Sequence, residues 1–96
     1  MSISRIIIYN LTLTNANEEY SQAIASFAHK IEIKCRTFAD MRLAYVSGES
    51  GTTYVTIPAG SGRTIAAADG RPISGILTLY LQSPSAGVVA EIEAYV

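Results

Sequence analysis

Two residue types that build chemical sites are scarce in this chain, which has one cysteine, Cys35, and one histidine, His29. A lone cysteine cannot close an internal disulfide, and one thiol with one imidazole cannot surround a metal ion. A nucleophilic triad needs a base beside a serine or cysteine, and His29 lies in a segment typical of a surface connection. Cys35 has alternating apolar neighbours, which favours a small buried core residue over a reactive thiol. We therefore expect no metal site, no cofactor, no catalytic residue and no enzymatic activity.

Charge is also scarce. Charged residues make up 16% of the 96 residues and the net charge is −1, whereas about 25% is typical of a soluble domain. No basic field exists to attract a phosphate backbone. The apolar run Ile6-Ile7-Ile8 is far too short to span a bilayer or to form the core of a signal peptide. We expect neither a nucleic-acid partner nor a membrane partner, and a chain made in the cytoplasm.

The low charge has a second implication. A small domain exposes most of its residues, so part of an apolar and small-polar surface is expected to be covered by another protein. A monomer with a surface rich in threonine and serine is the alternative.

Apolar and polar residues alternate in short segments separated by clusters of Gly, Asn, Pro and Ser, as in half-buried β-strands. The clearest case is residues 30–36, where Ile31, Ile33 and Cys35 share one face. No apolar spacing of three and four persists, so we expect no long helix and a loop at residues 23–30. The expected strands are residues 5–13, 19–24, 30–36, 41–46, 52–57, 75–83 and 88–96, with residues 64–68 as a short strand or a helical turn.

This length and spacing predict a single domain over residues 1–96. Seven or eight short strands at intervals of roughly 8–12 residues indicate an all-β fold, a small antiparallel β-sandwich or jelly roll.

Possible sites for chemistry have simpler structural explanations. Glu91 and Glu93 share a strand face and could form an acid–base pair, but the same pattern suits a solvent face beside Lys34 or Arg36. The glycine clusters at residues 48–51 and 60–62 lack the following helix and the lysine of a phosphate-binding loop, so hairpin turns explain them better. Glu18 and Glu19 are interpreted as turn residues.

Aromatic side chains leave sugar binding open as an alternative. Stacking on a sugar ring requires exposed rings, and the chain has six tyrosines but no tryptophan. Tyrosines spread over six strands are also typical of core and rim packing.

Five segments of the sequence resemble small β-sandwich virion proteins of tailed bacteriophages, and the resemblance extends from about Asn10 to Tyr95. Turns and strand faces carry it, in residues 17–22, 33–36, 45–60, 78–83 and 86–93. The small-residue loop at residues 65–71 departs from the pattern, since a more polar insertion is expected there. Proteins of this type are building blocks of the particle, as capsid cement or decoration or in the neck, tail or fibre.

The resemblance implies a capsid cement or decoration protein on the virion surface, made in the host cytoplasm. Its expected partners are the major capsid protein and copies of itself, as a dimer or trimer. Partly apolar contacts repeated over a symmetric lattice would then attach it through avidity. A neck, tail or fibre role and a carbohydrate-binding β-sandwich are the alternatives.

The N-terminal strand supplies the candidate protein-interface residues Ile3, Ile6, Ile8 and Tyr9. Residues 3–9 are unusually apolar on both faces of the expected strand, which favours a contact surface. Burial of this strand inside the sandwich is the alternative.

Overall fold

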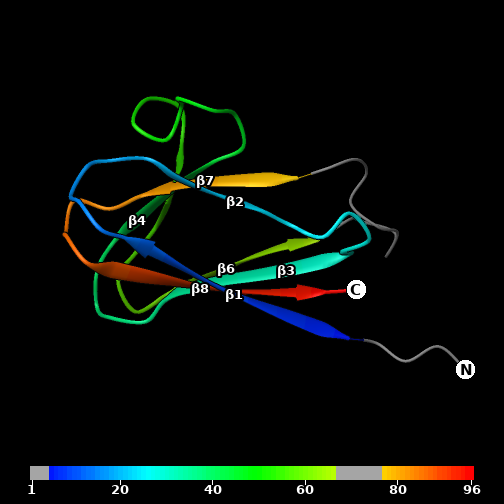
Figure 1. Cartoon of the computed structure of the whole chain (residues 1–96). Coiled ribbons are helices and arrows are strands. Elements are labelled where there is room, and N and C mark those ends of the chain that lie inside the picture. The colour runs from blue at the N-terminus through cyan, green and yellow to red at the C-terminus, as the bar shows by residue number, and fades with distance from the viewer. Residues whose placement is uncertain (1–4, 67–76) are drawn as a thin grey trace, which may run out of the picture.

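The computed structural model describes residues 5–66 and 77–96, and within these ranges it contains eight strands and no helix (Figure 1). This confirms the predicted all-β class. The strands are β1 Ile6–Leu13, β2 Tyr20–Ala23, β3 Lys30–Cys35, β4 Met41–Ala44, β5 Val55–Ile57, β6 Gly62–Ala66, β7 Thr78–Gln82 and β8 Val88–Tyr95.

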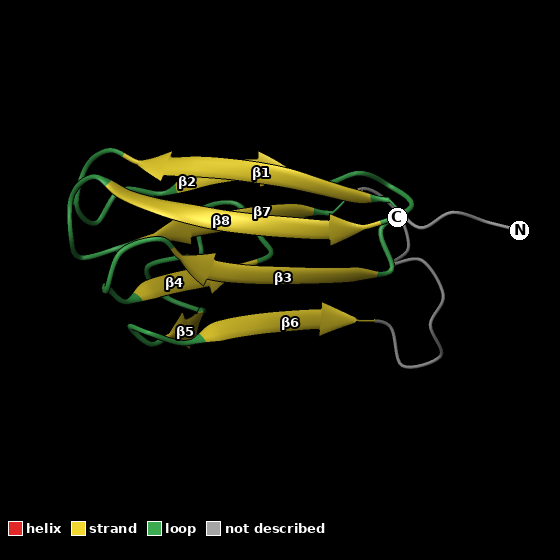
Figure 2. Ribbon diagram, turned by 90° about the horizontal axis from the view of Figure 1, so that it is seen from below, coloured by secondary structure: helices red, strands yellow, loops and turns green. Residues whose placement is uncertain are grey.

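The strands form two four-stranded sheets with the orders β1-β8-β3-β6 and β2-β7-β4-β5, called sheet A and sheet B. Every pairing within them is antiparallel. Figure 2 shows the two sheets stacked as layers with sheet A in front. Each sheet combines strands from both halves of the chain, which is the jelly-roll arrangement of two Greek keys. The predicted β-sandwich or jelly roll is therefore confirmed.

The core lies between the sheets because alternate side chains of each strand point inward. In β8, Val88, Ala90, Ile92 and Ala94 are at most 2% exposed, and the residues between them are half-buried. Full burial of one large aliphatic side chain stabilises a fold by about 1.5–3 kcal/mol. The remaining buried members of the core are Leu13, Ile24, Ala28, Ile31, Ile33, Met41, Leu43, Ile57, Leu79 and Leu81.

Three strand predictions need correction or completion. The strand expected at residues 41–46 ends at Ala44, and Tyr45 and Val46 form a bend. Residues 52–54 are not strand, because the backbone N–H groups of Thr52 and Thr53 both donate to the carbonyl of Glu49, and β5 begins only at Val55. The segment at residues 64–68 was left open between strand and helical turn. Its first three residues belong to β6, which begins earlier than expected, at Gly62. Its last two residues lie outside the described ranges.

The connection from β4 to β5 is tied to the body of the domain by one carboxylate. Glu19, just before β2, accepts hydrogen bonds from the Gly48 N–H at 2.8 Å, the Ser50 N–H at 3.1 Å and the Ser50 hydroxyl at 2.6 Å. Fully buried Ser50 in turn accepts from Gln82 Nε2 at 2.9 Å, and Arg42 Nη1 donates to Gln82 Oε1 at 3.2 Å. The interpretation of Glu19 as a turn residue missed this brace.

These hydrogen bonds act on the ionised form of the carboxyl group. The Ser50 hydroxyl, aided by the Gly48 and Ser50 backbone N–H groups, holds the pKa of Glu19 below its ordinary value against the opposing effect of burial. A carboxyl whose pKa is lower in the folded than in the unfolded state adds stability above the unfolded pKa. That contribution is lost as the pH falls through the folded pKa.

We therefore predict that Glu19→Gln lowers the free energy of unfolding by about 1–2 kcal/mol at neutral pH, because charge-assisted hydrogen bonds become neutral ones. The difference from the native chain should shrink as the pH falls below the ordinary range of a glutamate. Urea unfolding at several pH values measures it, with Glu49→Gln in the same loop as the control. A Glu19→Gln deficit that persists unchanged in acid would contradict the role of ionised Glu19.

Candidate binding surfaces

The predicted interface on the N-terminal strand is divided between two faces. Ile6 and Ile8 lie on the outer face of sheet A and are 48% and 65% exposed. Tyr9 lies on the opposite face, half-buried against the core, and its hydroxyl accepts a hydrogen bond from the Ala25 N–H at 3.1 Å. Ile3 lies outside the described residues. The side chains of Ile6 and Ile8 are thus exposed and free to contact another protein, whereas Tyr9 packs inside the sandwich.

The most exposed aromatic residues are two phenylalanines in loops. Phe27, in the β2–β3 connection, is 74% exposed, and Phe38, in the β3–β4 connection, is 84% exposed. They flank the same strand, whose six residues span about 20 Å. Figure 2 shows β3 running along the sandwich, so the two connections lie at opposite ends of the layer. The molecule therefore presents one bare phenyl ring at each end.

Phe27 borders a hollow of about 390 Å³ at its end of the sandwich. Ile7, Ala25 and Val96 contribute apolar surface to the hollow and Arg5 adds a positive charge at its margin. An apolar side chain from another protein would contact both the phenyl ring and this hollow.

Phe38 rests on the backbone of Gly60 in the β5–β6 connection. Gly60 has a φ of +79°, and a Cβ at this position would lie 2.9 Å from Phe38 Cε2, so both the turn and the ring require glycine here. Asp40 Oδ1 accepts a hydrogen bond from the Ala59 N–H at 2.7 Å and joins the same two connections. The Phe38 ring is thus supported on one side and open on the other.

A third exposed apolar area surrounds two tyrosines. Tyr45 and Tyr54 are 42% and 40% exposed and border a hollow of about 240 Å³, with Glu49 and Thr53 as its polar neighbours. The Arg42 guanidinium lies 5.1 Å from the centre of the Tyr54 ring, a cation–π distance that fixes one face of the ring. This is the arrangement that the sugar-binding alternative would need.

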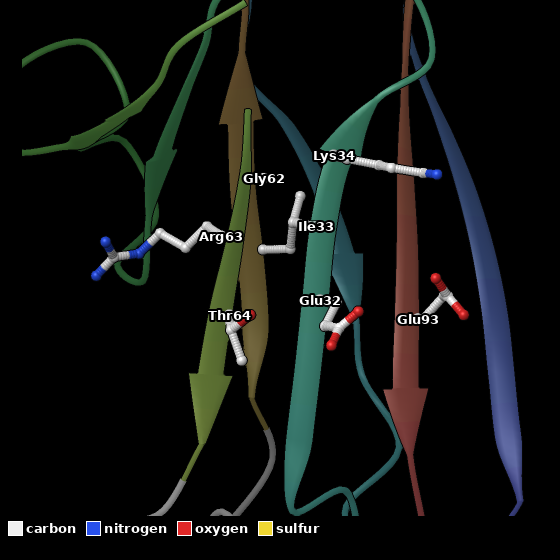
Figure 3. Close-up of a pocket in the computed structure, with 7 residues that line it drawn as sticks. All are labelled: Glu32, Ile33, Lys34, Gly62, Arg63, Thr64 and Glu93. Carbon is white, nitrogen blue, oxygen red and sulfur yellow. The ribbon is translucent and has the colours of Figure 1, made fainter. Parts of the chain in front are cut away.

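The outer face of sheet A holds a depression of about 160 Å³ with paired carboxylates (Figure 3). Glu32 and Glu93 are directly opposite each other on β3 and β8. Lys30 Nζ lies 3.3 Å from Glu32 Oε1, and the side chain of Lys34 lines the depression. Like charges in opposite positions destabilise a sheet. The two lysines therefore offset the repulsion between Glu32 and Glu93, and this arrangement does not indicate a catalytic cleft.

The same face holds the expected solvent-side ion pair. Arg36 Nε lies 3.1 Å from Glu91 Oε2, as the surface interpretation of that carboxylate predicted. Four residues farther along β8, burial together with Glu32 and Glu93 raises the pKa of Tyr95, and Lys30, 4.4 Å from the centre of the ring, acts in the opposite direction.

The single histidine and cysteine do not join these carboxylates. His29 is half-buried and its backbone N–H donates to the Tyr95 carbonyl at 3.0 Å, and it does not line the depression with Glu93. Cys35 faces the core, as predicted, but is only half-buried, with its Sγ 3.6 Å from Thr37 Oγ1. In residues 5–66 and 77–96, no three His, Cys, Asp or Glu side chains come together in a way that could hold a metal ion. The described part of the chain also has no helix long and apolar enough to cross a membrane.

Comparison with known proteins bears on the fold. No family model matches the sequence, and no curated protein matches it. Among solved structures, the chain is similar to a de novo designed double-stranded β-helix determined by solution NMR. The TM-score is 0.56 at 14% sequence identity, over 96% of this chain and 99% of the designed one. At this identity the likeness shows the fold alone.

We predict that Glu93→Gln raises the free energy of unfolding by about 0.2–1 kcal/mol at low ionic strength, because it removes the repulsion with Glu32. The gain should fall as salt is added. Glu91→Gln is the matched control two residues earlier on the same face, and it should lower stability slightly by removing the partner of Arg36. Thermal unfolding at low and high salt measures both, and equal effects of the two variants would contradict the assignment.

Proposed function

We propose that the chain is a structural binding protein that bridges neighbouring subunits of a larger assembly, as a capsid cement or decoration protein of a tailed bacteriophage. The observation that carries the bridging role is the pair of exposed phenylalanines, Phe27 and Phe38, in the connections at the two ends of β3. Single exposed apolar side chains are common on protein surfaces, so it is the placement of these two phenylalanines, in the connections at both ends of β3, that supports the proposal. Two exposed phenyl rings in connections at opposite ends of the layer suit contact with two separate subunits.

The energetics agree with attachment through many weak contacts. Burial of one phenyl side chain contributes about 1.5–3 kcal/mol, which is too little for a stable complex by itself. Two ends engaged at once, and repeated over a lattice, convert weak contacts into tight attachment through effective concentration. The low charge of the chain, at 16%, fits partly apolar contacts of this kind.

The setting of the proposal comes from the resemblance of the sequence to small virion β-sandwich proteins, and the fold supports it. Jelly rolls recur as building blocks of capsids and as lectin domains. The major capsid protein is the proposed partner and the capsid surface the proposed location.

We predict that Phe27→Ser and Phe38→Ser each weaken attachment to particles stripped of the chain by about tenfold or more, and that the double variant no longer attaches. Val46→Ser is the control, because Val46 is 56% exposed but lies in the β4–β5 connection, which carries neither phenylalanine. The measurement is the number of copies bound per particle, by quantitative mass spectrometry, with circular dichroism to confirm folding. Hundreds of copies per particle support cement, whereas about a dozen indicate a neck, tail or fibre component. Absence from particles would refute a virion role.

A second candidate is glycan binding, favoured by the hollow between Tyr45 and Tyr54. If it holds, Tyr54→Ala should abolish binding to the glycan identified on an array, because the ring supplies the stacking surface. Tyr80→Phe on β7 should leave that binding unchanged. A flat array at millimolar sugar, measured with the native chain, rejects this candidate.

A further inference from the structure

Strand β1 lies at the edge of sheet A, so one side of its backbone has no neighbouring strand within the described chain. Sheets normally protect their edges with short strands, proline, charged residues or bulges, because an unprotected edge pairs with other chains. Among the four edge strands of the described residues, β2 has four residues, β5 has three and is followed by Pro58, and β6 contains Gly62 and Arg63. Strand β1 has eight residues with no charge, proline or glycine.

The backbone groups on this free edge can be identified from the ladder with β8. Arg5 and Val96 exchange both backbone hydrogen bonds, at 3.1 and 2.8 Å, so they form a hydrogen-bonded pair. In an antiparallel ladder such pairs alternate with pairs whose backbone N–H and C=O groups point away from the neighbouring strand. The odd-numbered residues of β1 therefore bond to β8. The N–H and C=O groups on the free edge belong to Ile6, Ile8, Asn10 and Thr12, the residues whose side chains lie on the outer face.

A second copy of β1 fits this edge in one register. Antiparallel pairing about a twofold axis at Tyr9 places Ile6 opposite Thr12 and Ile8 opposite Asn10 of the second copy. All four residues with free backbone groups then find partners in the other strand, and inward and outward faces coincide across the junction. A twofold axis at Ile8 would leave Thr12 without a partner in β1, and an axis at Asn10 would leave Ile6 without one. The Tyr9 register also brings the two Ile8 side chains into diagonal contact on the outer face.

We propose that two copies of this chain associate through their β1 edges, centred on Tyr9, into one continuous eight-stranded sheet. The paired edge is about 27 Å long, and the shortest extent of the molecule, taken as the width of the contact, is 19 Å. The surface area buried on each copy is thus about 500 Å², at the lower limit for a specific interface. We expect a dissociation constant in the micromolar range or weaker for the isolated pair. This inference goes beyond the bridging function and does not depend on it, because it concerns the purified chain alone.

The test is sedimentation velocity of the full chain from micromolar to millimolar concentration, combined with amide hydrogen exchange by NMR. A monomer–dimer equilibrium is expected. The amides of Ile6, Ile8, Asn10 and Thr12 should gain protection only as the concentration rises, whereas those of Ile7, Tyr9 and Leu11 should be protected throughout. A chain that stays monomeric at millimolar concentration, or protection without this alternation, overturns the proposal.

Two variants act on different parts of the edge. Ile8→Lys brings two charges together near the axis and should raise the dissociation constant about tenfold or more. Asn10→Pro removes a free-edge N–H while leaving the bonds to β8, and Asn10→Thr is its control. Thr64→Lys, on the outer face of edge strand β6, is the control for Ile8→Lys and should not change association. Dimers that persist in folded Ile8→Lys place the interface elsewhere and refute the proposal.

Discussion

The fold depends on the burial of one side of β8, the strand that β1 and β3 flank in sheet A. Its inward side chains alternate between small and large, and all four are almost completely hidden from solvent. Because side chains alternate strictly between the two faces of a strand, this row fixes the faces of both neighbours through the register. It determines that Ile33 is buried and Glu32 is not, and that Tyr9 faces inward while Ile8 faces solvent. The surfaces available for binding follow from that constraint.

Much of the architecture could be predicted from the sequence because most strands alternate clearly. In β3 the pattern identifies both the strand and its inner face, and in β8 it separates the core residues from the carboxylates. In β1 the pattern fails, since Ile6, Ile7, Ile8 and Tyr9 are apolar at every position and either set could face inward. Only the pairing with β8 determines that Ile7 and Tyr9 are the residues that face inward. The order of strands within the two sheets is likewise a property of long-range pairing, which alternation does not encode.

The candidate surfaces were harder to predict than the core for a physical reason. Phe27 and Phe38 occur singly in connections, so no periodicity marks them. The available signal is that an aromatic residue in a predicted loop has no strand face on which to be buried. The hydrogen bonds from Ser50 to Glu19 could not be predicted from local sequence patterns. The two residues are 31 positions apart and meet only when β2 and the β4–β5 connection lie together.

The way in which that connection is held affects how the protein would be degraded. An extended surface connection is the ordinary site of proteolytic cutting, because a protease needs several residues free of the body of the protein to occupy its cleft. Here Ser50 is fully buried beneath its own loop, with Glu19 on one side and Gln82 on the other. Release of the loop requires the loss of contacts to Glu19, just before β2, and to Gln82 on β7, so local opening costs more than in an untethered loop. Digestion at this loop would therefore follow the rarer openings that disturb sheet B.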